Sequence, residues 1–340
     1  QQATVDLRGV ATDPAPQLAQ ICAQLVWTLA QPELSIRSVV VRIDGEEVDL
    51  EGVPAEQTVD DWASLDPDAV PVDGVGHYLG DGALRTVTAG EPAPGPAGTG
   101  AYGLTSAAVA ADDRTGALTF LVGVRKFPGG ASLLAGPYGG ELAPVLDATN
   151  FSAPTIAATR EEAWVVRDGT SIVRVLAGAA PQAVTAPTLF GLGRAEVLRL
   201  SPDGVRAAVV VEGPIGLALY VGTVVRAEDG SVALRDLRDI APALSQVADV
   251  AWGDSDTLLV LAGDAGDDRI APYSVGVDGW GLVQVPTAGL PSSPSTIAGA
   301  PTRQPLVDAG GTIWHLAGGT WVTLVRGREP LPGTAPFYPL

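Results

Sequence analysis

The feature that most constrains the fold is a hairpin motif, LRLSPDGVRAAVVVE, at residues 198–212. Its first strand alternates leucine with arginine, which is the period of a strand with one buried face. In the turn that follows, Pro202 presets the backbone and Gly204 closes the turn without a side-chain clash. The mainly apolar residues 205–211 predict a buried second strand. Because one hairpin is only marginally stable in water, the motif indicates a larger β-structure around it.

The same order of a strand of small residues, a polar turn and an apolar strand recurs along the chain. The spacing of roughly 45–50 residues is typical of four-stranded propeller blades. Radial repetition of such blades also protects strand edges that would otherwise be exposed. We therefore predict a β-propeller. The five repeats begin near Ser106, Thr155, Leu198, Asp249 and Thr296.

A further hairpin at residues 77–87, with a Gly-Asp-Gly turn, precedes the five repeats and is too short to be a blade. It either adds strands to the last blade or forms an extra blade with the C-terminal tail at 336–340. The sequence leaves five and six blades open. Because an open ring would expose a strand edge, we expect residues 83–88 to pair with either 320–325 or the 337–338 tail.

The first 50 residues have a different pattern, in which a helix lies between strands. Alternating residues predict strands at 4–8 and 36–43, and apolar residues at helical spacing predict the helix. The acidic, proline-containing segment that follows has Trp62 as its large aromatic residue and is typical of a connector. We expect one face of the helix to pack against both strands, through Leu18, Ile21, Leu25 and Leu29.

The predicted fold is thus mainly β, a propeller of five or six four-stranded blades preceded by a small α+β fragment. The fragment covers residues 1–50, a connector covers 51–74 and the propeller covers 75–340. A hydrophobic content of 46% is ample for a packed core. No apolar run approaches the ~20 residues that a membrane helix needs.

The charge balance limits the classes of partner. The chain has 39 acidic and 20 basic residues, a net charge of −19, whereas nucleic-acid binding requires a basic face. The same charge disfavours direct adhesion to anionic lipid. Cys22, the sole cysteine, has no partner for a disulfide and lies on the apolar face of the predicted helix. We therefore predict a small buried hydrophobic residue rather than a reactive thiol.

Residue types that carry catalysis are scarce. The two histidines, His77 and His315, are far apart in sequence, and Lys126 is the only lysine. The sequence contains no nucleophile elbow, no HExxH motif, no cysteine cluster and no P-loop lysine. His315 falls on a predicted blade strand, where a structural histidine is the favoured interpretation. We predict no catalytic residue, no cofactor and no enzymatic turnover.

The best metal candidate is the GDAGDD loop, which carries Asp264, Asp267 and Asp268. Carboxylate oxygens suit calcium, but the spacing misses the calcium-loop pattern, so we predict no metal site. The Gly191–Gly193 segment lacks the following helix of a phosphate-binding loop. Other acidic residues are expected to form Asx-type turns: Asp112, Asp113, Asp254 and Asp256.

Five tryptophans fall within the predicted blades. An aromatic platform for carbohydrate is one interpretation, and core packing is the favoured one. The five are Trp164, Trp252, Trp280, Trp314 and Trp321.

A known family shares these features in the same order. The run VDLRGVA, the helix LAQICAQLVWTLAQ and the strand IRSVVVRIDGEEV resemble the end of a GerMN domain. A GerMN domain followed by a β-propeller, with the turn SPDG and the ending LPGTAPFYP, resembles the actinobacterial LpqB lipoprotein family. The resemblance covers nearly the whole chain. The family's lipobox and the first part of its GerMN region are not in this sequence, so we expect a C-terminal fragment.

The resemblance implies a lipid-anchored protein on the outer face of the cytoplasmic membrane, with the anchor outside this fragment. It also implies that the partner is the extracellular domain of an MtrB-type sensor kinase, whose signalling through the MtrA–MtrB two-component system the lipoprotein modulates. The family brings no catalytic residues. Two alternatives stay open. The propeller could bind cell-wall glycan or peptide, or it could be a metal-dependent hydrolase, which the scarcity of histidine disfavours.

Overall fold

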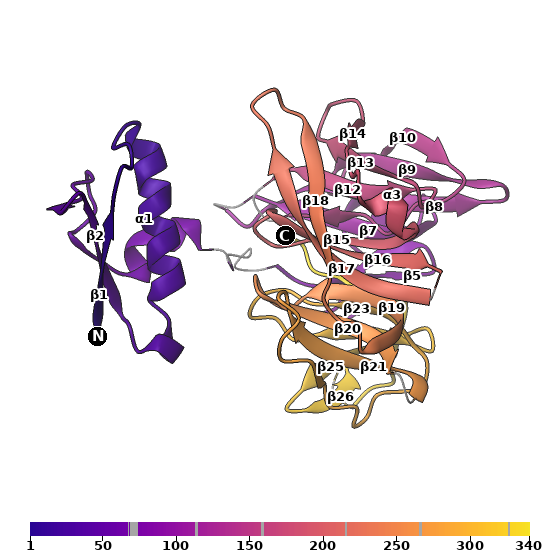
Figure 1. The fold of residues 1–340 in the computed structure, drawn as a ribbon. Coiled ribbons are helices and arrows are strands. Elements are labelled where there is room, and N and C mark those ends of the chain that lie inside the picture. The colour runs from indigo at the N-terminus through magenta and orange to yellow at the C-terminus, as the bar shows by residue number, and fades with distance from the viewer. Residues whose placement is uncertain are drawn as a thin grey trace. The chain divides into compact units, whose positions relative to one another are not determined.

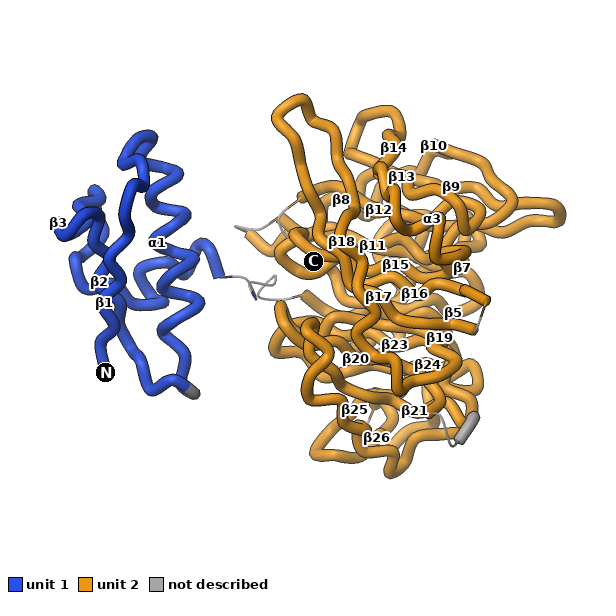
Figure 2. The backbone as a smooth tube through the Cα atoms, viewed as in Figure 1, with its two compact units in different colours: residues 1–69 blue, residues 70–340 orange. Residues whose placement is uncertain are grey.

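The computed structural model describes residues 1–66, 68, 74–112, 115–157, 160–214, 216–264, 267–325 and 327–340. The chain divides into two compact units, Gln1–Ala69 and Val70–Leu340, which are coloured separately in Figure 2. Most described residues of the second unit lie in β-strands. Among the described residues, no helix is both long enough and apolar enough to cross a membrane.

The first unit contains a small sheet and one long helix. Strand β1 (Gln2–Leu7) runs parallel to β2 (Ser38–Ile43), and helix α1 (Ala15–Leu29) connects them, as a parallel pair requires. Strand β2 also pairs with two short strands, β3 (Glu46–Glu47) and β4 (Glu56–Gln57). The helix and strands predicted from periodicity are therefore confirmed.

The buried face of α1 is rotated from the predicted one. Leu18 is buried as expected, but Ile21, Leu25 and Leu29 are only partly buried, and of these three only Leu25 and Leu29 pack against the core of the first unit. The helix packs both on β2 and on the 3₁₀ helix η2 (Val59–Leu65), which shifts the covered stripe. The fully buried positions are Leu18, Cys22, Ala23 and Val26.

Part of the predicted connector belongs to this first unit. Trp62, at the centre of η2, is 6% exposed and packs in the same core as α1 and β2. Its indole N–H donates to Gln57 Oε1 at 3.1 Å, and Trp27 Nε1 donates to the Trp62 carbonyl at 3.2 Å. The first unit therefore extends to Ala69 rather than ending at residue 50. Residues 67 and 69–73 of the predicted connector lie outside the described residues.

The described strands of the second unit form six sheets, the blades of a propeller (Figure 1). Blade 1 contains β7 (Leu104–Ala111), β8 (Leu118–Phe127), β9 (Gly130–Pro137) and β10 (Ala143–Ala148). Blade 2 contains β11 (Thr155–Ile156), β12 (Glu162–Arg167), β13 (Ser171–Leu176) and β14 (Gln182–Val184). Blade 3 contains β15 (Arg194–Leu200), β16 (Arg206–Gly213), β17 (Gly216–Arg226) and β18 (Val232–Asp239).

The remaining blades complete the ring. Blade 4 contains β19 (Leu244–Trp252), β20 (Thr257–Asp264), β21 (Asp267–Gly276) and β22 (Val283–Gln284). Blade 5 contains β23 (Pro294–Ala298), β24 (Leu306–Ala309), β25 (Thr312–Ala317), β26 (Thr320–Thr323) and the added strand β27 (Leu331–Pro332). Blade 6 contains β28 (Thr334–Phe337), β5 (His77–Gly80) and β6 (Ala83–Thr86). Short helices are η1 (Pro32–Leu34) in the first unit, and α2 (Gly95–Gly98) and α3 (Leu189–Leu192) in the second.

Blade 6 closes the ring with segments from both ends of the propeller, as predicted. The pairing differs from the expectation, because the tail strand β28 pairs with β5 rather than with β6. The outer edge of β6 is already bonded, since Thr86 N donates to Glu91 O and Ala93 N donates to Leu84 O, both at 2.9 Å. The described strands thus settle the blade number at six.

The central motif shows why apolar strands suit this fold. In β16, Ala207, Val209 and Val211 pack in the core between blades 2 and 3. The alternate residues Ala208 and Val210 pack in the core between blades 3 and 4. Both faces of the strand are buried, which is why its sequence is a continuous apolar run instead of an alternating one.

The SPDG turn before β16 is held by its own polar side chains. Asp203 Oδ1 accepts hydrogen bonds from Ser201 Oγ at 2.5 Å and from Val205 N at 3.1 Å. Ser201 Oγ in turn accepts from Arg206 N at 2.9 Å. Gly204 has a φ of +70°, a conformation that a residue with a Cβ adopts only at a cost.

Candidate functional site

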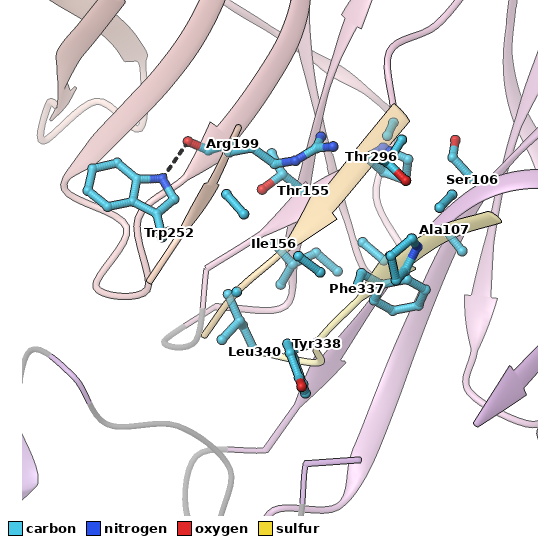
Figure 3. Close-up of a pocket in the computed structure, with 18 of the residues that line it drawn as sticks. Ser106, Ala107, Thr155, Ile156, Arg199, Trp252, Thr296, Phe337, Tyr338 and Leu340 are labelled. Atoms are coloured by element: carbon cyan, nitrogen blue, oxygen red, sulfur yellow. Dashed lines mark hydrogen bonds between the residues drawn. The ribbon is translucent and has the colours of Figure 1, made fainter. Parts of the chain in front are cut away.

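The innermost strands of the six blades line a narrow central channel (Figure 3). Ser106, Thr155 and Thr296 contribute hydroxyl groups, while Phe337 and Leu340 from the C-terminal tail contribute apolar surface. The free volume is about 90 Å³. Ligand pockets usually span about 300–1,000 Å³, so the channel has room for a few waters but not for a substrate-sized molecule.

A buried ionic network joins the blades beside this channel. Arg199 Nη2 of blade 3 lies 3.1 Å from Asp249 Oδ1 of blade 4. Asp249 Oδ2 accepts a hydrogen bond from Ile297 N of blade 5 at 2.9 Å. Burial raises the pKa of Asp249, Arg199 opposes the rise, and the nearby charge of Asp308 adds to it. Both oxygens of Asp249 are engaged, so its carboxylate serves to connect three blades.

Asp308 extends the network to the closing blade. Its oxygens accept hydrogen bonds from Ser295 Oγ at 2.8 Å and from Thr296 Oγ1 at 2.9 Å. The backbone N–H of Ala335, in the tail strand, donates to Asp308 Oδ2 at 3.4 Å. Figure 3 also shows Trp252 Nε1 donating to the Arg199 carbonyl, at 3.0 Å. The carboxylates of Asp249 and Asp308 and the hydroxyl of Thr296 are thus committed to structure.

A second buried ion cluster clamps blade 2 to blade 3. Glu162, 4% exposed, accepts two hydrogen bonds from Arg226, at 3.0 and 3.1 Å, and one from Arg174 at 3.3 Å. Trp164 Nε1 also donates to Glu162, and Arg226 lies 5.9 Å from the centroid of the Trp164 ring. Burial acts to raise the pKa of Glu162, but the bonds from Arg226 and Trp164 hold that pKa below its usual value. This carboxylate is also a structural bridge.

The two histidines lie in different blades. His77, 1% exposed in β5, has Nε2 2.9 Å from Tyr138 Oη and its ring stacked on Phe337, with centroids 5.6 Å apart. Burial lowers the pKa of His77 to about 4, and the nearby Val75 backbone acts in the opposite direction. His315 lies in β25, and burial lowers its pKa as well. His315 lies on a blade strand as predicted, but its Nδ1 is buried without a hydrogen-bond partner among the described residues, so it is not a fully hydrogen-bonded structural histidine.

Asp112 and Asp254 form the predicted turns, whereas the Asp256 carboxylate instead accepts a hydrogen bond from Arg206 Nη1 at 3.0 Å. Asp112 Oδ1 accepts hydrogen bonds from Thr115 N and Thr115 Oγ1, both at 2.8 Å. Asp254 Oδ1 accepts one from Asp256 N at 2.9 Å. Asp113 lies outside the described residues. The carboxylates of Asp112 and Asp254 therefore shape turns.

The calcium candidate is only partly described. Asp264 is exposed at the end of β20, whereas residues 265–266 and the side chains of Asp267 and Asp268 lie outside the description. Within the described residues, no group of three or more His, Cys, Asp or Glu side chains could hold a metal ion. The absence of a metal stays a prediction.

The glycine segment and the cysteine lie in the structural settings that the sequence predicted. The Gly191–Gly193 segment is followed at Arg194 by strand β15, not by a helix. Cys22 is fully buried, and burial raises the pKa of its thiol while Gln57 opposes the rise. A raised pKa keeps this thiol protonated and unreactive.

A larger open pocket lies on the outer part of blade 5. Its volume is about 770 Å³, and Trp314, His315, Trp321 and Thr323 are among its lining residues. The indole N–H groups are already used, since Trp314 donates to Thr312 Oγ1 at 2.9 Å and Trp321 donates to the Pro286 carbonyl at 2.8 Å. The described lining has no Asp, Glu, Lys or Arg, so the pocket suits an uncharged ring-bearing or peptide group.

Trp280 contradicts the prediction that the blade tryptophans are core residues. Trp164, Trp252 and Trp321 are buried, but Trp280 is 80% exposed, and nearby Val283 is 59% exposed. The backbone of Trp280 is fixed, because Gly276 N donates to its carbonyl at 2.8 Å and its N–H donates to Asp278 Oδ1 at 3.0 Å.

A sequence signal for this exposure existed. Trp280 stands between Gly279 and Gly281, whose φ angles are +87° and +69°. Glycines on both sides indicate a turn instead of a strand. A tryptophan in a turn is more exposed than one in a blade strand. The sequence prediction grouped Trp280 with the tryptophans of the blade strands and so did not predict its exposure.

Comparison with known proteins identifies a family for most of the chain. The family model described as the lipoprotein LpqB beta-propeller domain matches residues 82–339. Lipoprotein LpqB of Rhodococcus opacus (strain B4) is 32% identical over 351 residues, covering 97% of this chain and 57% of that protein. Lipoprotein LpqB of Mycobacterium tuberculosis (strain CDC 1551 / Oshkosh) is 30% identical over 356 residues, covering 99% of this chain and 58% of that protein. The chain thus spans a little over half the length of these relatives.

Solved structures support the fold alone, because their sequence identity is low. The chain matches one in a crystal structure of a nidogen/laminin complex with a TM-score of 0.55 and 11% identity, covering 78% of this chain and 98% of that chain. It also matches a crystal structure of TolB from Acinetobacter baumannii with a TM-score of 0.52 and 11% identity. This match covers 99% of this chain and 96% of the TolB chain.

Proposed function

The chain belongs to the LpqB lipoprotein family, and we propose that it is a non-enzymatic interaction module on the outer face of the cytoplasmic membrane. Relatives that are lipoproteins imply a lipid-anchored protein of the cell envelope. The proposed partner is the extracellular domain of an MtrB-type sensor kinase, whose signalling in an MtrA–MtrB type two-component system the module modulates. We also propose that the first unit is the end of a GerMN-like domain, which its β1-α1-β2 order supports.

The observation that carries this proposal is the exposed Trp280 on a rigid blade. Tryptophan is among the residues that contribute most to binding energy at protein interfaces. Here its loop is fixed by backbone hydrogen bonds while 80% of the residue remains accessible to solvent. Val283 adds a second exposed apolar side chain three residues later. Together they offer an anchor that costs little conformational entropy to immobilise.

The charge around this anchor indicates a basic partner surface. Asp278 is exposed within the same loop, and the Asp256 carbonyl accepts a hydrogen bond from Val277 N at 2.9 Å. The Asp256 side chain is 74% exposed, although it pairs with Arg206 at 3.0 Å. With a net charge of −19 on the chain, association with a Lys- and Arg-rich patch should be steered electrostatically.

Binding to the purified kinase ectodomain tests the proposal. Trp280→Ala should weaken binding by more than tenfold, as expected of a central interface anchor. Phe127→Ala, which removes another exposed aromatic side chain from blade 1, is the matched control and should leave the affinity unchanged. Raised salt should slow association more than dissociation. Equal affinity of the wild type and Trp280→Ala would refute the assignment of this surface.

A second candidate function, binding of cell-wall glycan or peptide, is favoured by the blade 5 pocket. Its volume of about 770 Å³ is in the usual range for ligand sites, and its aromatic, uncharged lining suits a sugar ring. Retention of the protein on purified cell wall, abolished by Trp314→Ala and unchanged by Trp280→Ala, would support this function. Crosslinking of the full-length lipoprotein in its native envelope would identify the partner in either case.

A further inference from the structure

The β8–β9 hairpin of blade 1 has an exposed tip of unusual composition. Arg125, Lys126 and Phe127 are consecutive and exposed, and Phe127 is 43% accessible. The hairpin lies at the edge of the propeller (Figure 1). Its inner neighbour β7 pairs with β8 only as far as Arg125, and its outer neighbour β10 pairs with β9 only from Ala131. Residues 126–130 therefore extend beyond both neighbouring strands.

The tip is locally basic in a strongly acidic protein. Residues 115–140 contain no Asp or Glu, although the chain has 39 of them, and Lys126 is the only lysine. The carboxylate on the neighbouring strand, Asp147, accepts a hydrogen bond from Ser132 Oγ instead. Arg125 and Lys126 thus have no ion-pair partner among the described residues.

The other long hairpin of the propeller, β17–β18, shows that this composition is not a general property of exposed hairpins. It carries exposed Arg235 and Arg238, but Asp236 and Asp239 alternate with them. Its net charge near the tip is further lowered by Glu228 and Asp229. Only the β8–β9 tip, among the described hairpins of the propeller, combines unpaired cations with an exposed phenylalanine and no carboxylate.

We propose that the β8–β9 tip contacts the headgroup layer of an anionic bilayer. Phe127 enters the interfacial region, and Arg125 and Lys126 bind lipid phosphates, the division of roles that aromatic and basic residues show at membrane surfaces. The family's lipid anchor makes a membrane the acidic surface nearest to this protein. An acidic protein surface offers similar charge, but the lipid anchor holds the protein at a bilayer, which supplies both phosphates for the two cations and an apolar region for Phe127.

The expected strength is modest, and it suits an orienting contact. A basic residue near an anionic surface increases binding by about 5.5-fold, so two increase it by about 30-fold. The net charge of −19 opposes adhesion, but salt at physiological strength screens charges beyond about 8 Å. A lipid anchor supplies a high effective concentration at the membrane, so a weak contact suffices to bias orientation.

Vesicle binding by the 340-residue chain tests the proposal at low ionic strength. The probe vesicles are phosphatidylcholine alone and an equimolar mixture of phosphatidylcholine with phosphatidylglycerol. The chain should bind the mixture and not the neutral vesicles. The double variant Arg125→Gln/Lys126→Gln should bind about 30-fold more weakly, as two lost basic contacts imply. Phe127→Ser should also weaken binding, with less dependence on salt.

The matched control removes two other exposed cations, as Arg235→Gln/Arg238→Gln, and should change vesicle binding less than about twofold since their positions lie among carboxylates. Unchanged circular dichroism and thermal melting would establish that the tip variants fold. Equal binding of wild type to both vesicles, or equal weakening by the two double variants, would overturn the proposal. So would loss of kinase binding in the tip variants with vesicle binding intact. Trp280→Ala should retain full vesicle binding, which separates this inference from the proposed function.

Discussion

The central channel of this propeller and its outer surface differ in what their side chains contact. The outer surface, called the rim below, carries Trp280, the β8–β9 tip and the blade 5 pocket, and it leaves side chains exposed that the centre would bury. At the centre, Asp249 and Asp308 are 2% and 3% exposed, and their oxygens accept hydrogen bonds both within blade 5 and across blade boundaries. On the rim, Trp280 is 80% exposed although its backbone N–H and carbonyl are both hydrogen-bonded. A tryptophan at the centre, Trp252, is instead 3% exposed.

This difference indicates where recognition can take place. A site must leave polar or apolar groups available to its ligand, and the centre leaves few, within about 90 Å³. The rim leaves an indole, a basic hairpin tip and an open pocket available. Blade closure and partner binding are therefore assigned to separate residues, which mutations can test one at a time.

The largest effect should come from opening the ring. Deleting residues 334–340 removes β28, the inner strand of blade 6, and exposes the edge of β5. Because a propeller depends on closure to protect its edges, we expect loss of the cooperative thermal transition and aggregation. Circular dichroism melting is the measurement. A truncated protein that melts at the wild-type temperature would show that the centre does not depend on closure.

The next effect concerns the ionic network. Asp249→Ala leaves the Arg199 guanidinium buried without its partner and removes the acceptor of Ile297 N. Breaking a buried pair in this way typically costs about 3–5 kcal/mol. Asp249→Asn retains an acceptor and should cost less. Chemical denaturation of both variants measures the free energy of unfolding. If the alanine variant lost less than about 1 kcal/mol in its free energy of unfolding, the ionic network would contribute little to stability.

A smaller effect should depend on pH through His77. Its pKa is about 4 in the folded state, against the usual value of 6.5 for an exposed histidine, so the unfolded state binds the proton more tightly. Stability should fall as pH decreases from about 6.5 to about 4, by up to about 3 kcal/mol, and level off below. Asp249, with a raised pKa, acts in the opposite direction. The measurement is therefore the difference between wild type and His77→Gln, and a difference independent of pH would contradict the assignment.

The smallest effect on stability should come from the rim. Trp280→Ala removes an 80% exposed side chain and should change the free energy of unfolding by less than about 0.5 kcal/mol. Trp164→Ala is the buried counterpart, 0% exposed, and should cost about 3–5 kcal/mol. Denaturant titration of both variants gives the contrast. Similar losses at the two positions would remove the distinction between rim and core.

Sequence patterns predicted the propeller because its physical basis is local. A blade strand is recognisable from its own period and turn, as in residues 198–212, and closure by both chain ends follows from the need to protect edges. The partner of the tail strand was not predictable, since the segment that occupies the edge of β6, Glu91–Ala93, lacks a strand pattern. The rotation of α1 had a similar cause, because η2 lies within a segment interpreted as a connector.

The candidate site was less predictable than the fold. Composition indicated the scarcity of catalytic residues, but Asp249 and Asp308 come together across about 60 residues of sequence through blade geometry. Exposure of Trp280 depends on two glycines with positive φ, a turn signal that the blade pattern concealed. The charge of the β8–β9 tip was visible in the sequence, but its exposure required the register of four strands.

The central claim is that recognition belongs to the rim, and one binding experiment addresses it most directly. The dissociation constant for the kinase ectodomain should be measured for wild type, Trp280→Ala and Ser106→Val, the last of which adds bulk in the central channel. The account predicts more than tenfold weaker binding for Trp280→Ala and no change for Ser106→Val. Weaker binding with Ser106→Val and unchanged binding with Trp280→Ala would contradict it and move the site to the channel.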